Sequence, residues 1–499
     1  MIDLNLIIVI FKPEIFLVIS IIMLLNYKFW FKEQFNNMYP LIFLIYSIIS
    51  LIITLILVIN VGFESVYFTI FVLNLKIYFI KIIILLISIS CLILFRNCLI
   101  HSETNCLEYF IFYIFTTLIA LIAIMFNHFY LSFIALEFLT LCFYILSSFN
   151  YNNFGFLLFR LFPYRKLFNI SSLVLVLGIF LIEFHNYFVN LFINNRVSSY
   201  FNWVDYKEYI LICGIILILL SLFIKMIVFH TPTYFIYYQK TPLITIIYMH
   251  LIPKIIFFYV IADLIYTNYY FKEYTYYINV LVICLALVCL IISIGMRRLF
   301  LKHILEYISL VNSGYLLLCF TPLTFDSLKF CIYFLFVYIL VIFFYGGVVL
   351  FFDIQEYPGK RISFDTILVG IEKKDYCSIV SSTLLFFILG LPPTRRDYPC
   401  SRGIPFNGFL CQWFVLGSLL VNQSYLIFSL LTIFNLIIVF FFLGTIIPFW
   451  YEKRNLKYSW YPKLNSDLLI LILFFFINLI FVLNIDILFI YNFINSFYD

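Results

Sequence analysis

The sequence predicts an all-α polytopic membrane protein with about 14 transmembrane helices. Hydrophobic residues make up 65% of the 499 residues and charged residues 11%, whereas a soluble domain carries about 25% charged residues. Apolar runs of about 20 residues, the length that crosses a bilayer as a helix, recur along the chain. No basic residue precedes the apolar run at the N-terminus, so we expect no cleavable signal there.

Each predicted span is an apolar run bounded by polar or charged residues. In chain order the spans cover residues 8–26, 39–61, 73–95, 107–126, 129–149, 167–188, 208–228, 243–266, 276–296, 301–320, 327–352, 376–391 continuing at 405–421, 424–448 and 467–492. Prolines in HTPTYFIYYQKTPL and LGLPPT predict broken helices 7 and 12. Such breaks occur where the freed backbone faces protein or water, as at transporter ion sites. Regions 208–245 and 376–421 share this span, break, helix order, which is consistent with a repeat.

The basic residues support the span count, because they gather on the side of a membrane that is not translocated. Eighteen lysines and arginines lie in loops after odd-numbered spans, against three (Arg196, Lys207 and Lys272) in loops after even-numbered spans. We therefore expect both termini on the outer side and the basic loops on the matrix or cytoplasmic side.

Composition also bears on cofactors and origin. The twelve cysteines form no CxxC motif and no Cys/His cluster, so we expect buried thiols and no redox cofactor or metal bound by this chain. The 65 phenylalanines and 40 tyrosines, with 15 glycines, indicate an AT-rich genome, of which mitochondrial genomes are the common case.

Three charged residues lie near the middle of predicted spans: Glu137 in FIALEFLTLCFYIL, Lys225 in LSLFIKMIVF and Lys254 in HLIPKIIFFYV. A charge at mid-span costs at least roughly 2.5–3.5 kcal/mol on insertion scales, so a functional site with a nearby partner is the default interpretation. A Glu–Lys pair stabilises both charged forms, and loosening it releases the lysine proton, which a second lysine can accept. The alternative is a static ion pair that fixes helix packing.

Other charges and polar groups have simpler interpretations. Lys76 and Lys81 lie toward one end of the third span, where lysines reach the interface, and Asp263 and Asp486 are interpreted as interfacial anchors. Several polar side chains could either fix helix packing or line a hydrated path across the bundle: Thr140, Ser221, Thr241, Thr245, His250, Ser309, Asn312 and Ser313.

The motifs in chain order resemble a known family. They resemble helices of the subunit 2 family of respiratory complex I, NADH:ubiquinone oxidoreductase, of the mitochondrially encoded type. The first helix of the family is matched by PEIFLV (13–18), and the fifth by FNHFYLSFIALEFLTLCFYILSSF (126–149). The seventh and eighth are matched by FIKMIVFH with TPLITIIYMHLIPKIIFF, the tenth by HILEYISLVNSGYLLL, and the twelfth by LGLPPT with GFLCQWFVL. These are antiporter-like, proton-pumping membrane subunits with inverted repeats. The resemblance covers nearly the whole chain.

The resemblance implies roles for particular residues. Glu137 matches the glutamate of the family's helix-5 ion pair, Lys225 its helix-7 partner and Lys254 the central lysine of helix 8. Thr140 and His250 are further relay candidates. Glu137 would then modulate the proton affinity of a lysine during turnover.

The chain departs from the family pattern in its second half. Gln412 stands where the family carries the terminal lysine of helix 12, and Asn312 stands where relatives often have histidine; both remain relay candidates. An insert at 395–407 brings three arginines and one aspartate. It either replaces the missing cation or, as we favour, contacts a neighbouring subunit. The outer half of the relay would then be altered or closed.

The family implies one membrane domain over 1–499: helices 1–4 (1–126), a first half-channel (127–266), helices 9–13 (267–448) and helix 14 (449–499). It also implies a place in the mitochondrial inner membrane, basic loops on the matrix side, and both termini in the intermembrane space. Neighbouring membrane-arm subunits and lipids would be the partners, with no nucleic acid. FMN, iron–sulfur clusters and ubiquinone would belong to the rest of the complex. Two alternatives stay open: a subunit of a multisubunit cation/proton antiporter, and a structural membrane-arm subunit that pumps nothing.

Overall fold

The structure is a computed structural model of the whole chain, and part of the chain is described. The described residues are 11–30, 39–61, 66–67, 71–99, 106–126, 129–148, 169–184, 203–228, 243–267, 275–295, 301–318, 320–321, 331–343, 352–356, 360–361, 416–417, 425, 428–429, 431–433 and 458–462.

Helices occupy the first eleven predicted spans. They are α2 (Lys12–Trp30), α3 (Tyr39–Val61), α4 (Leu75–Leu99), α5 (Cys106–Met125), α6 (Phe129–Ser148), the helix Asn169–Phe184, α8 (Trp203–Val228), α10 (Leu243–Thr267), α12 (Thr275–Gly295), α13 (Leu301–Leu318) and the helix Cys331–Phe343. Most of their ends lie within a few residues of the predicted bounds, because the apolar runs themselves set the helix lengths. The proposed breaks of helices 7 and 12 and the last spans lie largely or wholly outside the described residues.

At least five of these helices are long and apolar enough to cross a membrane. Within the described parts of the chain the spans are Leu41–Val61, Leu75–Ile93, Leu107–Met125, Tyr130–Ser147 and Thr245–Asp263. With several such helices, the chain is a multi-pass membrane protein. Pro253 lies inside α10 and the helix continues through it, which membrane helices tolerate when neighbouring groups satisfy the freed carbonyl.

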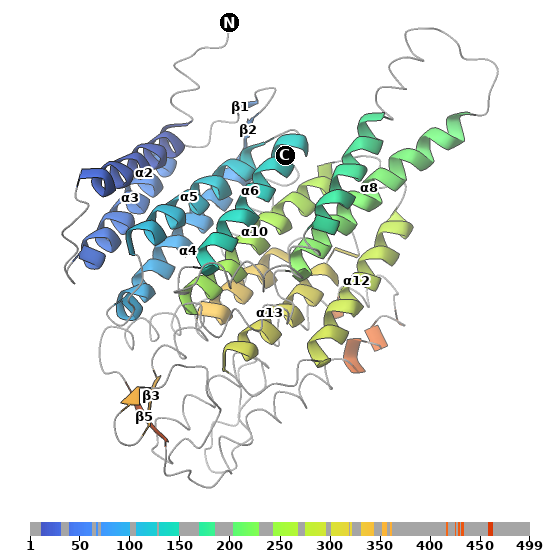
Figure 1. Cartoon of the computed structure of the whole chain (residues 1–499). Helices are drawn as coiled ribbons and strands as arrows, with labels where there is room; N and C mark the ends of the chain where they lie inside the picture. The colour runs from blue at the N-terminus through green and yellow to red at the C-terminus, as the bar shows by residue number, and fades with distance from the viewer. Residues whose placement is uncertain are drawn as a thin grey trace, which may run out of the picture. The chain divides into compact units, whose positions relative to one another are not determined.

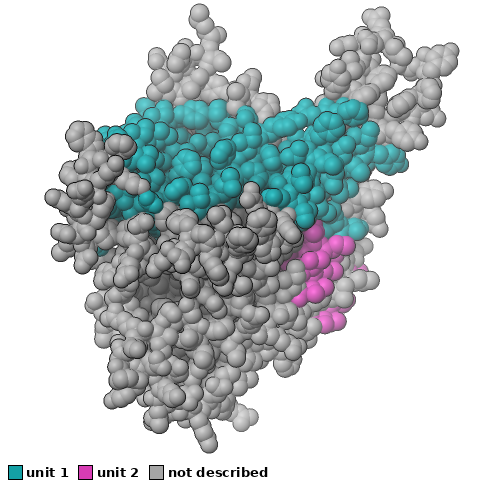
Figure 2. Space-filling view, viewed as in Figure 1, with its two compact units in different colours: residues 1–229, 244–281, 499 teal, residues 230–243, 282–498 magenta. Residues whose placement is uncertain are grey.

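Contacts divide the chain into two compact units, coloured separately in Figure 2. Unit 1 comprises 1–229, 244–281 and residue 499; unit 2 comprises 230–243 and 282–498. In unit 1, α2 packs on α3 and α5, α4 packs on α3 and α5, and α5 packs on α6. These helices run side by side in Figure 1. In unit 2, the helix 331–343 lies against α13, since the Tyr315 and Phe334 rings are 6.1 Å apart.

Hydroxyl groups inside these helices are satisfied locally. On α3, the Ser47, Ser50 and Thr54 side chains each donate a hydrogen bond to the carbonyl three residues earlier, over 2.7–2.8 Å. The same arrangement recurs at Ser88 on α4 and at Ser221 on α8. A helix can therefore bury a hydroxyl without a partner on another helix, which lowers the cost of placing it in an apolar medium.

One end of unit 1 is fixed by aromatic side chains. Phe71 lies just before α4, with its ring centroid 4.8 Å from that of Phe11 and 5.1 Å from that of Phe126. Phe11 precedes α2, and Phe126 follows α5. The start of α2, the start of α4 and the end of α5 therefore meet at one end of the bundle, as expected for helices that alternate in direction.

Nearly all of the described secondary structure is helical, as predicted, but five short strands were not anticipated. In unit 1, β1 (Val66–Tyr67) pairs antiparallel with β2 (Val72–Leu73). In unit 2, β3 (Phe352–Glu356) lies between β4 (Lys360–Arg361) and β5 (Tyr458–Pro462), both antiparallel to it. Three of the strands lie outside the predicted spans, while β2 ends at the first residue of one span and β3 starts at the last residue of another. Extended segments there satisfy their backbone groups by pairing with one another.

Candidate functional site

Lys225 and Glu137 form an ion pair between α8 and α6, both in unit 1. The Lys225 ammonium donates a hydrogen bond to Oε1 of Glu137. The Lys225 side chain is fully buried, whereas the Glu137 side chain is 29% exposed. The pair joins residues 88 positions apart in the sequence, so it forms only when the two helices pack.

The local sequence of α6 explains the position of Glu137. Leu136 and Leu139 are buried in the bundle, while Ile134, Phe138 and Leu141 are exposed. Glu137 lies at the boundary between these two faces, from which its carboxylate reaches α8. The Thr140 hydroxyl donates to the backbone carbonyl of Glu137 over 2.7 Å, so its hydrogen bond serves the helix backbone.

An aromatic ring completes the surroundings of the ammonium group. Nζ of Lys225 lies 5.3 Å from the ring centroid of Phe133, which is one helical turn before Glu137 on α6. A cation over a ring face in a desolvated place gains about 1–2 kcal/mol. The same helix therefore offers Lys225 both a carboxylate and a ring face. Phe133 could not be identified from the sequence, because the apolar residues around it give no distinguishing signal.

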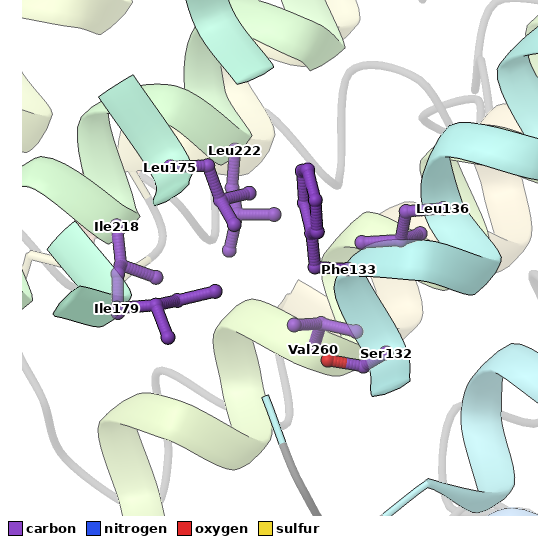
Figure 3. Close-up of a pocket in the computed structure, with 8 residues that line it drawn as sticks. All are labelled: Ser132, Phe133, Leu136, Leu175, Ile179, Ile218, Leu222 and Val260. Atoms are coloured by element: carbon purple, nitrogen blue, oxygen red, sulfur yellow. The ribbon is translucent and has the colours of Figure 1, made fainter. Parts of the chain in front are cut away.

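A small apolar pocket lies among the helices that carry this pair (Figure 3). Its empty volume, which includes space open to the outside, is about 250 Å³. Its lining residues come from α6, the helix Asn169–Phe184, α8 and α10: Ser132, Phe133, Leu136, Leu175, Ile179, Ile218, Leu222 and Val260. Ser132 is the one polar side chain among the described residues of the lining, so the space between these helices is largely apolar and strengthens electrostatic interactions near it.

Two glycines set the distance between α8 and the helix before it. A Cβ atom built on Gly178 would lie 2.8 Å from Cγ1 of Ile218 and 2.9 Å from the Gly214 carbonyl oxygen. A Cβ on Gly214 would lie 2.8 Å from Cγ1 of Ile182. Small residues at such crossings let helix backbones approach closely in membranes. This contact holds α8, and with it Lys225, in place.

Lys254 is deeply buried on α10, in the same unit. It is 1% exposed, and His250, one turn earlier on the same helix, is 0% exposed. The two side chains interact electrostatically. Since Val260 of α10 lines the pocket together with Leu222 of α8, the helices that carry Lys254 and Lys225 meet around one apolar space.

Hydrogen bonds and ring stacking hold this part of α10 against α5 and α6. The Tyr248 hydroxyl is 3.1 Å from the Thr116 hydroxyl of α5. Its ring stacks on Tyr113 at 4.4 Å and lies 5.4 Å from Phe143 of α6. Tyr113 in turn donates to the Ser88 carbonyl of α4 over 2.8 Å. This cluster was not predicted from the sequence. It fixes the position of the Lys254 helix against α5 and α6.

The remaining site candidates are placed separately or lie outside the described residues. Asn312 is half-buried on α13 of unit 2, between Ser309 and Ser313, both of which are 0% exposed. The residues that lie outside the described part of the chain are Gln412, Thr241, His230, Asp486 and the insert 395–407.

The interpretation of Lys81 as an interfacial residue was wrong. Both Lys76 and Lys81 were expected to reach the interface, yet they are 6% and 2% exposed. Nζ of Lys81 donates to Oε1 of Glu14 on α2, over 2.6 Å. Burying an unpaired ammonium would be costly, so the lysine stays inside because a carboxylate from another helix meets it. The signal in the sequence was Glu14, an acid in the first turn of α2.

Comparison with known proteins gives one relative in sequence. No family model matches the chain. The sequence is similar to NADH-quinone oxidoreductase subunit N of Rickettsia felis, at 24% identity over 421 residues, which cover 82% of this chain and 85% of that protein. The similarity thus spans most of both proteins.

Solved structures share the fold along most of their length. A chain of respiratory complex I from Thermus thermophilus matches with a TM-score of 0.66 and 16% identity, over 95% of this chain and 97% of that one. A chain of the membrane-bound sulfane sulfur reductase, an archaeal respiratory membrane complex, matches at 0.69 and 14%, over 99% and 96%. A chain of the Mrp complex from Dietzia sp. matches at 0.61 and 13%, over 89% and 80%. This chain shares its fold with chains of these complexes.

Proposed function

We propose that this chain is a membrane-arm subunit of a complex I type NADH:quinone oxidoreductase and that it translocates protons coupled to electron transfer elsewhere in the assembly. The observation that carries the proposal is the ion pair between the fully buried Lys225 and Glu137, with a second buried lysine, Lys254, on an adjoining helix. The similarity to NADH-quinone oxidoreductase subunit N supports the choice of complex.

The arrangement suits proton transfer by side chains alone. While Glu137 contacts Lys225, the carboxylate stabilises the ammonium form, which the apolar surroundings would otherwise disfavour. If Glu137 withdraws, the ammonium loses that stabilisation inside a medium of low dielectric constant, and the proton leaves. Lys254 is the acceptor we assign, and His250 lies one turn away from it. The partial exposure of Glu137 gives its carboxylate room to move.

The chain's own part in the reaction is proton handling. FMN, iron–sulfur clusters and quinone would be bound by other subunits, and this chain would bind none of them. Its partners would be neighbouring membrane subunits and lipids. We propose a location in a mitochondrial inner membrane from the Phe- and Tyr-rich composition alone. The relative found in sequence is bacterial and does not support that location. Basic loops would face the matrix and both termini the intermembrane space.

Gln412 sets one limit on the proposed path. A glutamine amide cannot take up and release a proton as a lysine does, so the path through helix 12 would be altered or closed. The proton-to-electron ratio of the intact enzyme tests this: a ratio equal to that of relatives with a lysine at this position contradicts closure.

Assembly is the first test of the proposal. Membranes solubilised in mild detergent are separated on a native gel stained for NADH oxidation, and the chain is located by mass spectrometry. We expect it in the stained band in a fixed ratio to the other subunits. Migration in a separate band would contradict the proposal.

A second candidate is a subunit of a multisubunit cation/proton antiporter, and the fold shared with a chain of the Mrp complex favours it. The same ion pair and central lysine would serve such a protein. Sodium-dependent proton flux in vesicles without NADH supports this candidate, whereas flux that requires NADH oxidation supports the first. In a purely structural subunit, replacing Glu137 while assembly is kept would reduce neither sodium-dependent proton flux nor NADH-driven proton flux.

A further inference from the structure

A second buried Glu–Lys pair lies in unit 1, apart from the site described above. Nζ of Lys81 on α4 is 2.6 Å from Oε1 of Glu14 on α2, and the two side chains are 3% and 4% exposed. The residues are 67 positions apart in the sequence. Lys81 lies within the apolar span Leu75–Ile93.

Among the described residues, only one of the two carboxylate oxygens of Glu14 has a hydrogen-bond donor. Oε2 of Glu14 is buried and has no hydrogen-bond partner among the described residues. A buried oxygen of a charged carboxylate without a donor is unfavourable, and such atoms are rare in native proteins. A proton bound at this oxygen removes the charge that lacks a donor. The orphaned oxygen therefore points to a group that binds a proton or a water molecule.

Two more charged groups lie on α4 and on α10, the helix of Lys254. Lys76, on the first turn of α4, is buried and interacts electrostatically with Asp263 of α10. Lys76 precedes Lys81 by five residues, or about 7.5 Å along the helix. Asp263 follows Lys254 by nine residues, or about 14 Å along α10. Asp263, Lys76, Lys81 and Glu14 thus all lie toward the end of unit 1 where α2 and α4 begin.

We propose that the Glu14–Lys81 pair is a proton-exchange site at this end of unit 1, which Asp263 and Lys76 connect to Lys254. The connection to Lys254 rests on the proposed function; the proton exchange at Glu14 does not. In the resting pair, the ammonium and the carboxylate sum to zero charge. One proton taken up at Glu14 gives a carboxylic acid beside the ammonium, with a net charge of +1. Release of that proton to water at the bundle end restores the ion pair, so protons and charge balance over the cycle.

This site would offer a route that does not pass through helix 12, where Gln412 stands. Among the described residues, the other titratable side chains of these helix starts are Lys12, which is exposed, and Tyr78, which is buried. The alternative role is a static bond between α2 and α4, and a test must separate the two.

The test is infrared titration of the purified assembly that contains this chain, isolated through a tag on it. We expect the native protein to show a carboxylic-acid carbonyl absorption that rises as the pH falls, is shifted in D₂O, and is missing in Glu14→Gln. The matched control is Glu183→Gln, because Glu183 is an exposed carboxylate on the helix 169–184; it should keep the absorption. A native spectrum unchanged by Glu14→Gln over the whole titration would overturn the proposal.

An apolar double variant, Glu14→Leu with Lys81→Met, guards against misfolding, since it leaves no buried charge unpaired. We expect it to assemble, to keep its electron-transfer rate and to lose protons translocated per electron. Undiminished translocation in this variant means a static pair and contradicts the proposal. Failure of the proposed function looks different: the wild-type protein then shows no NADH-driven translocation, while the titration of Glu14 is still observed.

Discussion

Replacing Glu137 with glutamine removes the charge that faces Lys225 and nearly conserves volume. Truncating one partner of a buried ion pair costs about 3–5 kcal/mol, because the other charge is left without compensation. Lys225 is fully buried, but Glu137 is 29% exposed, so solvent screens part of the interaction and we reduce the figure to about 2 kcal/mol. That energy corresponds to about 30-fold in any equilibrium that depends on the pair.

The assay compares proton translocation with electron transfer in vesicles that contain the assembled complex. We expect Glu137→Gln to assemble, and to lose most proton translocation per electron at the same expression level. Lys225→Met and the double variant complete a mutant cycle, in which the double variant should be less impaired than the two single effects combined, because the residues act as a pair. Glu183→Gln, an exposed carboxylate on a neighbouring helix, is the control. Full coupling in assembled Glu137→Gln would refute the reasoning.

Two further predictions concern how the site is held. Gly178→Val places side-chain atoms against Ile218 and the Gly214 carbonyl. We expect it to lower the stability by about 1–3 kcal/mol and to reduce the amount of assembled complex, measured by thermal unfolding and native gel. Gly417→Ala is the control and should be neutral, because the space around the Cβ position of Gly417 is open. Thr116→Val leaves the buried Tyr248 hydroxyl without its hydrogen-bond partner at 3.1 Å, which costs about 1–3 kcal/mol of stability. Adding Tyr248→Phe should recover part of the lost melting temperature. If it recovers none, the lost hydrogen bond is not the cause of the destabilisation.

The helices could be predicted well from the sequence, because a bilayer fixes the length of an apolar run. The span 39–61 matches α3 at both ends, and 243–266 differs from α10 by one residue. The charges at 137, 225 and 254 were found for the same physical reason, since each interrupts an apolar run. Pairing of Glu137 with Lys225 was expected from the family resemblance, and the structure places the two side chains in contact.

Tertiary contacts account for what the sequence did not reveal. Lys81 was interpreted as an interfacial residue because its distance from the helix end allows it to reach water, but Glu14 on a helix 67 residues away holds it inside. The Tyr248, Thr116 and Tyr113 contacts use residue types that are common in every span. Pairing of β3 with β5 joins segments about 100 residues apart, and nothing in either segment indicates the other.

The most direct test of proton transfer through this chain is the proton-to-electron ratio of the assembled complex with Lys254→Met, measured in vesicles against the native complex. Lys254 is 1% exposed on α10, so the apolar, similarly long methionine should fit without preventing assembly. We predict normal assembly, retained NADH oxidation and a clear drop in protons moved per electron. An unchanged ratio in the assembled variant would contradict the role of Lys254 and, with it, the proton path proposed for this chain.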